Sequence, residues 1–133
     1  YNDSVLETVQ NCGILYSRTV ITTDDFRLPE NFLTWHPTCH YCADNRMELA
    51  EKFLEENHEE TYLSPSLFYV WGHAYQLDAY NDWKGIESFF AKIGKKDNIW
   101  YASNIEICRY MLAVRIPVQE IIFLILPVWM YGL

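Results

Sequence analysis

In four segments of the chain, hydrophobic residues recur with the three- to four-residue spacing of an amphipathic helix. The first and last of these segments begin with a Ser-x-x-Glu capping box. The first and third end at a glycine, a residue suited to a left-handed helix stop. The pattern predicts four helices, which begin at Ser4, at Asp44 or Asn45, at Asn81, and at Ser103.

Three other segments have the composition of strands. The longest, Leu67–Trp71, is an unbroken apolar run that follows Ser64-Pro65-Ser66 and stops at Gly72, which predicts a strand buried on both faces. The other two are Ile14–Val20 and Ile99–Ala102. Because helices and strands alternate, the order predicts an α/β fold in which helices cover parallel strands, in an open sheet or a barrel.

The composition favours a folded domain, or part of one. Half of the 133 residues are apolar and 17% are aromatic, so the chain can bury a sizeable core. A net charge of -8 argues against a nucleic-acid partner, which would need clustered Lys and Arg side chains. The four cysteines are too few for a disulfide framework, and the C-x-x-C at Cys39 has no second pair for zinc, so we expect reduced thiols. The chain contains no G-x-G-x-x-G, P-loop or G-x-S-x-G, which disfavours a nucleotide enzyme and a serine hydrolase.

His73 is the first candidate for chemistry, because it follows the predicted central strand directly after Gly72. In sheets of parallel strands with helical crossovers, substrates bind at the carboxyl ends of the strands. A histidine packed at a strand end for structural reasons is the alternative. Arg18 lies near the carboxyl end of the first predicted strand, where an ordinary ion pair and a substrate contact fit equally well.

The segment 22–43 has no helical period and many polar and aromatic side chains, and loops of this length are often functional. It contains Asp25, within a pair of carboxylates, and two histidines, His36 and His40, at i and i+4. Together they could offer one oxygen and two nitrogens to a divalent metal. Pro37 disfavours a continuous helix through the histidines, so their spacing need not place both rings on one side. A metal site and solvated or capping side chains therefore both stay open.

Several short motifs occur along most of the chain, in an order and at a spacing that one family shares. They are Asn11–Ile14, Tyr16–Val20, Leu28-Pro29 with Phe32–Trp35, Pro37–His40, Leu67–His73 and Asp97–Ile107. On these motifs the chain resembles the carboxyl-terminal portion of bacterial polysaccharide deacetylases with a NodB-type homology domain, which remove acetyl groups from N- or O-acetylated sugars. The resemblance implies part of a distorted (β/α) barrel with parallel strands and outer helices.

The resemblance also implies metal-assisted hydrolysis. In the family, a T-F-D-D motif and an H-(S/T)-x-x-H motif hold a divalent metal such as zinc, and both are expected before Tyr1. A histidine that follows a strand acts as general acid, and His73 matches its position. An imidazole can hold a proton for the departing amine or alkoxide while the metal polarises the acyl oxygen. The metal roles do not transfer to Asp25, His36 and His40, because a full strand-and-helix unit separates the two motifs in the family.

Arg18, Trp35 and Trp71 are the candidates for contact with the sugar. Trp35 suits either the wall of a sugar cleft or a structural position. Tyr41 is a departure from the family pattern, because relatives often have a second histidine after the one that corresponds to His40.

These expectations combine into one interpretation with two alternatives. Residues 1–115 are predicted to be the carboxyl-terminal part of a polysaccharide deacetylase-like domain, which alone is inactive and binds no stoichiometric metal. Residues 116–133 are predicted to be an apolar tail from a shifted reading frame or a truncated gene, and its prolines argue against a membrane-spanning helix. The alternatives are a non-catalytic carbohydrate-binding or interaction module and a self-contained metal hydrolase that uses Asp25, His36 and His40. The sequence predicts no cellular location.

Overall fold

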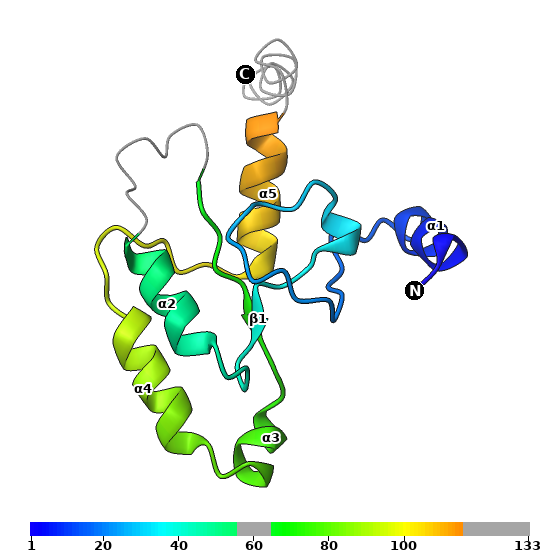
Figure 1. Cartoon of the computed structure of the whole chain (residues 1–133). Helices are drawn as coiled ribbons and strands as arrows, with labels where there is room; N and C mark the ends of the chain where they lie inside the picture. The colour runs from blue at the N-terminus through cyan, green and yellow to red at the C-terminus, as the bar shows by residue number, and fades with distance from the viewer. Residues whose placement is uncertain (56–64, 116–133) are drawn as a thin grey trace, which may run out of the picture. The chain divides into compact units, whose positions relative to one another are not determined.

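The computed structural model of the chain describes residues 1–55 and 65–115 (Figure 1). The chain divides into two compact units, Tyr1–Trp100 and Tyr101–Leu133, and each is described by itself. The described part of the second unit contains α5, Asn104–Arg115. The elements of the first unit are α1 Asp3–Asn11, the 3-10 helix η1 Phe32–Thr34, β1 Cys39–His40, α2 Arg46–Glu55, β2 Val70–Trp71, α3 Ala74–Ala79 and α4 Trp83–Ile93.

Parallel pairing of extended segments organises the first unit. Just before β1, Trp35 forms an isolated parallel bridge with Arg18. There the Trp35 N–H donates to the Ser17 carbonyl oxygen at 3.1 Å, and the Trp35 carbonyl oxygen accepts the Thr19 N–H at 3.0 Å. Further along, β1 and β2 form a two-stranded parallel sheet. Their register places Cys39 opposite Val70 and His40 opposite Trp71, so the carboxyl ends of both strands lie at the same edge.

The predicted (β/α) barrel is wrong. Within the described residues the regular structure is mostly helical, and the sheet has only two strands of two residues each. The predicted strand 14–20 forms a single bridge, and residues 99–102 form no strand. The central run 67–71 is half-buried rather than buried, and only its last two residues form β2. A ladder needs a partner segment alongside every residue, and apolar composition alone does not provide one.

The four predicted helices are confirmed as α1, α2, α4 and α5. The N-cap of α1 is Asn2 rather than Ser4, and Gly13 follows the helix with φ 72°, a left-handed conformation. At α5 the predicted capping contact forms, because the Glu106 carboxylate accepts the hydroxyl and the backbone N–H of Ser103 at 2.6 and 2.8 Å. These bonds hold the pKa of Glu106 below its usual value. The short elements η1, β1 and α3 were not predicted.

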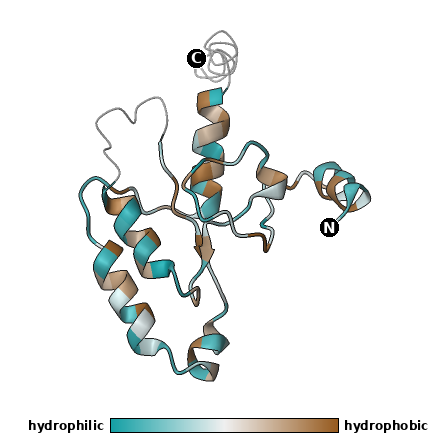
Figure 2. Ribbon diagram, in the orientation of Figure 1, coloured by the Kyte–Doolittle hydropathy of each residue, from teal (hydrophilic) through white to brown (hydrophobic). Residues whose placement is uncertain are grey.

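A hydrophobic core forms where α2 packs against α4 (Figure 1). Ala50 of α2 and Phe89 of α4 are fully buried, and Tyr41 and Ile86 complete the buried cluster. Both helices combine hydrophobic with hydrophilic positions, as an amphipathic pair requires (Figure 2). Because Tyr41 directly follows β1, this core fixes the carboxyl end of that strand.

Within residues 1–55 and 65–115, no helix is long and apolar enough to cross a membrane. The predicted apolar tail, 116–133, and the hypothesis of a shifted reading frame lie outside the described residues.

Candidate functional site

Two histidines lie at the carboxyl ends of the two parallel strands. His40 is the last residue of β1, and His73 follows β2 after Gly72. Gln76 of α3 joins them, because its side-chain oxygen Oε1 lies 3.1 Å from His40 Nε2 and 3.1 Å from His73 Nδ1. The same oxygen accepts the backbone N–H of His73 at 3.1 Å. The structure therefore brings the predicted candidate His73 and His40 together around one amide oxygen.

The hydrogen bonds assign different roles to the two imidazole rings. Nδ1 of His40 accepts the backbone N–H of Cys42 at 3.1 Å, so the ring proton is on Nε2, which donates to Gln76. Nδ1 of His73 donates to the Gln76 oxygen, because an amide oxygen can only accept a hydrogen bond. Among the described residues, Nε2 of His73 has no hydrogen-bond partner, and the side chain is exposed. His73 therefore has a nitrogen that a ligand can reach, whereas both nitrogens of His40 are occupied.

Trp71 of β2 connects the other predicted contacts to this pair. The guanidinium carbon of Arg18 lies 3.9 Å from the centroid of the Trp71 ring, which is a cation–π contact. The same ring meets His40 and His73 edge-on, with ring centroids 4.7 and 5.6 Å apart. Arg18, Trp71 and His73 of the predicted site therefore lie together.

Trp35, the fourth predicted site residue, lies in the interior instead. Its side chain is 1% exposed, and its ring contacts Phe32 and Tyr69 at centroid distances of 5.1 and 4.9 Å. A sugar at the surface cannot reach a ring buried in this way. The structure thus favours the structural interpretation of Trp35 over a role in the wall of a cleft.

Tyr41 fixes the backbone next to His73. Its hydroxyl donates to the His73 carbonyl oxygen at 2.8 Å, and its ring stacks on His40 at a centroid distance of 4.8 Å. Gly72 provides the necessary space, because a Cβ atom at that position would lie 1.8 Å from Tyr41 Cδ1. The tyrosine that departs from the family pattern therefore supports both histidines.

A cleft of about 660 Å³ opens beside Gln76. His40 and Gln76 line it, together with Tyr80 and the ion pair of Arg46 with Asp82. Two guanidinium nitrogens of Arg46 lie 2.6 and 3.0 Å from the two carboxylate oxygens of Asp82, and these hydrogen bonds raise the pKa of Arg46. The imidazole, amide and phenol groups around the cleft suit a polar ligand with several oxygen atoms.

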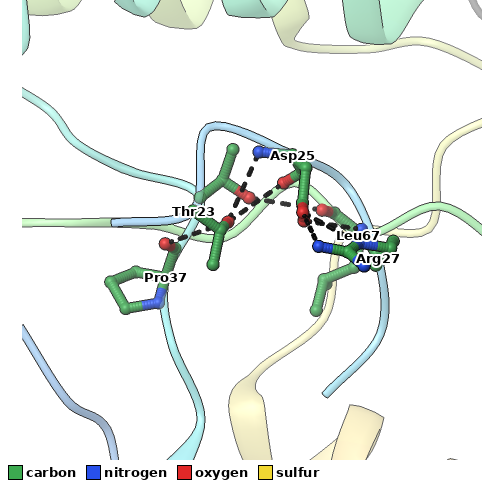
Figure 3. Close-up of polar contacts among 6 residues, drawn as sticks. Thr23, Asp25, Arg27, Pro37 and Leu67 are labelled. Atoms are coloured by element: carbon green, nitrogen blue, oxygen red, sulfur yellow. Dashed lines mark hydrogen bonds and ion pairs between the residues drawn. The ribbon is translucent and has the colours of Figure 1, made fainter. Parts of the chain in front are cut away.

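The three residues of the alternative metal site have separate partners. Asp25 pairs with Arg27 at 2.5 Å (Figure 3), and although burial opposes its ionisation, the bonds from Arg27 hold the pKa of Asp25 below its usual value. His36 Nδ1 lies 2.6 Å from Thr19 Oγ1, while His40 contacts the site described above. Across residues 1–55 and 65–115, no three His, Cys, Asp or Glu side chains are arranged to hold a metal ion.

The C-x-x-C pattern contains an inaccessible thiol. Cys39 is fully buried in β1, and burial raises the pKa of its thiol to about 11, whereas Cys12 is exposed. Because the thiolate is the reactive form, and only about 0.1% of Cys39 would be thiolate at about pH 8, this thiol would react slowly even with free access. We expect iodoacetamide to label Cys12 in the folded chain and Cys39 only after unfolding, as measured by peptide mass spectrometry. Equal labelling rates for these two thiols in the folded chain would contradict the burial of β1.

Sequence reasoning missed Gln76, although a weak signal for it exists. The pattern His73-x-x-Gln76 has the spacing of a capping box, and the Gln76 side chain does accept the His73 N–H. Histidine is not a preferred N-cap residue, so the spacing alone indicates little. The contact between Gln76 and His40 has no sequence signal, because the two residues are 36 positions apart in the chain.

Comparison of the chain with family models, with curated proteins and with solved structures gives no match. The resemblance to polysaccharide deacetylases therefore rests on the sequence motifs alone, and the function must be argued from them and from the site.

Proposed function

We propose that this chain is part of a carbohydrate hydrolase, similar to the polysaccharide deacetylases, that removes acetyl groups from N- or O-acetylated sugars. The sequence motifs suggest the reaction, and the observation that supports it is the setting of His73. Its ring is exposed beyond the carboxyl end of a parallel strand, with Nδ1 bonded to Gln76 and Nε2 accessible. The proposal depends on this local arrangement and needs no barrel.

In this proposal His73 is the general acid. Hydrolysis adds water across the bond between the acetyl carbon and the sugar nitrogen or oxygen, and the leaving atom takes up one proton as that bond breaks. The His73 imidazolium donates this proton from Nε2, while Nδ1–H stays bonded to Gln76 Oε1 in both charge states. Imidazole suits the role because its charge changes between about pH 5 and pH 8.

The resemblance also implies a divalent metal such as zinc, but the described residues do not fit one. Asp25 is paired with Arg27, and His36 and His40 bond to different partners. We therefore assign no step to a metal held by these residues. The proposal places the metal-binding motifs in sequence outside this chain.

Acetate release from acetylated chitooligosaccharides and acetylxylan tests the proposal. It is measured for the longest polypeptide that the locus encodes and for this chain alone. We expect the longer polypeptide to be active, His73→Ala to lower its kcat at least about 100-fold, and His36→Ala to leave it unchanged. Full activity of His73→Ala would refute the proposed acid. His73-dependent acetate release by this chain alone would refute the interpretation that the chain is only part of a catalytic domain. Loss of activity in His36→Ala would favour the self-contained metal hydrolase.

A non-catalytic carbohydrate-binding module is the second candidate, because aromatic rings are exposed from α3 to the first residue of α4. Tyr80, which lines the cleft, is 62% exposed, and Tyr75 and Trp83 are 68% and 54% exposed. Rings with an apolar face and a polar edge are common in binding surfaces. Saturable binding of oligosaccharide without acetate release, weakened by Tyr80→Ala, would favour this function over hydrolysis.

A further inference from the structure

Gln76 has a second hydrogen-bonding group beside the cleft. Its oxygen Oε1 accepts three N–H groups, from the ring of His40 and from the ring and backbone of His73. Its amide nitrogen has two N–H donors and no hydrogen-bond partner in the part of the chain that the structure describes. Gln76 also lines the cleft. One planar amide group therefore contacts the proton-bearing nitrogen of His73 and also borders the space where a ligand would lie.

We propose that Gln76 is the positioning residue of this site. Its oxygen keeps the ring proton of His73 on Nδ1, and its amide N–H group donates to an oxygen atom of an N-acetylated sugar in the cleft. The choice of ligand rests on the proposed function, whereas the effect on His73 does not.

A helix cap alone does not account for these contacts. The capping box of α3 pairs the His73 backbone N–H with Gln76 Oε1 and places the His73 side chain against the first turn of the helix. The His40 ring donor comes from β1 and takes no part in this cap, yet it meets the same oxygen. Hydrogen bonds to an amide oxygen polarise the group and make its own N–H bonds stronger donors. The cluster around Oε1 thus prepares the opposite end of the Gln76 amide to bind a ligand.

The cleft also indicates the charge of that ligand. Arg46 and Asp82 both line it and are paired with each other at 2.6 Å, while Asp44 adds one more carboxylate to the lining, which disfavours an anionic ligand. A charged ligand would have to compete with this pair, whereas an uncharged ligand would leave it intact. Hydroxyl and acetamido carbonyl oxygens of a sugar are neutral acceptors that the Gln76 N–H group can reach from the lining of the cleft.

Nitrogen-15 NMR of the histidine rings tests the positioning role without requiring activity. At about pH 9, where imidazole rings are neutral, we expect His73 to have Nδ1 protonated and Nε2 unprotonated. Gln76→Leu removes the acceptor and should abolish the single Nδ1–H form, whereas Gln76→Glu retains an oxygen acceptor and should preserve it. The ring of His36, which contacts Thr19 instead, is the internal reference and should not change in either variant. Persistence of the Nδ1–H form in Gln76→Leu, or its loss in a Gln76→Glu chain with an unchanged His36, would overturn the role.

Titration with N-acetylated chitotetraose tests the ligand contact. We expect the side-chain amide resonances of Gln76 to shift saturably, and Gln76→Glu, which has no amide donors, to bind about tenfold more weakly. Gln10→Glu makes the same charge change on α1 and should bind normally. Equal affinity in Gln76→Glu would overturn the contact. If no oligosaccharide binds, the ligand contact fails, whereas acetate release by the longer polypeptide decides the proposed function and the NMR result on His73 decides the positioning role.

Discussion

Replacing Gly72 with alanine is expected to destabilise the chain by about 1–3 kcal/mol, the usual cost of overpacking a tight interior. The new Cβ would lie 1.8 and 1.9 Å from Cδ1 and Cε1 of the Tyr41 ring. That ring is 7% exposed, stacks on His40 and is held through its hydroxyl by the His73 carbonyl oxygen, so it cannot move aside without losing these contacts. Urea unfolding followed by tryptophan fluorescence measures the free energy of unfolding. Because Gly72 precedes His73, the substitution should also displace the candidate acid.

A double-mutant cycle separates this clash from other effects of the extra methyl group. Tyr41→Ala removes the ring, so adding Gly72→Ala to that background should cost much less than in the natural chain. An equal cost in the two backgrounds would place the strain elsewhere and contradict the close approach of Gly72 to Tyr41.

Local signals in the sequence predicted the helices, whereas the sheet depended on contacts that no local signal reports. Gly13 follows the C-cap residue of α1, Gly94 is the C-cap residue of α4, and Ser103 with Glu106 caps α5. β1 was missed because it lies in a segment without periodicity and exists only through pairing with β2, some 30 residues away. Element order predicted parallel strands in an open sheet or a barrel, and the family resemblance implied the barrel. Neither determines how many residues of a strand find a partner.

The candidate site divides in the same way. His73 could be identified because an apolar run ends at a glycine followed by an imidazole, and parallel pairing does place it beside a second strand end. Its tautomer could not be predicted, because Gln76 and His40 together determine the hydrogen bonds around it. For Trp35 the sequence could not predict burial, because it does not distinguish a tryptophan in a cleft wall from one that is 1% exposed.

Removal of one member of the Arg46–Asp82 ion pair is the second change with a large expected effect. The side chains are 14% and 25% exposed, and Arg46 also donates to the Tyr41 carbonyl oxygen at 2.8 Å. Asp82→Ala leaves a largely buried guanidinium group without its carboxylate, which should cost about 2–3 kcal/mol of unfolding free energy. Because Arg46 holds the backbone of Tyr41, we also expect Asp82→Ala to weaken oligosaccharide binding in the cleft.

Three further variants test whether the buried charge is the cause. Arg46→Met combined with Asp82→Leu should recover part of the lost stability, because an apolar pair needs no counter-ion. Gly85→Ala should resemble Asp82→Ala, since a Cβ there would lie 2.0 Å from the Asp82 carboxylate. Glu51→Gln breaks an ion pair between two exposed side chains, Glu51 (54% exposed) and Lys92 (39% exposed). It should leave the urea midpoint unchanged. If Glu51→Gln were as destabilising as Asp82→Ala, burial of the Arg46–Asp82 pair would not explain the effect of Asp82→Ala.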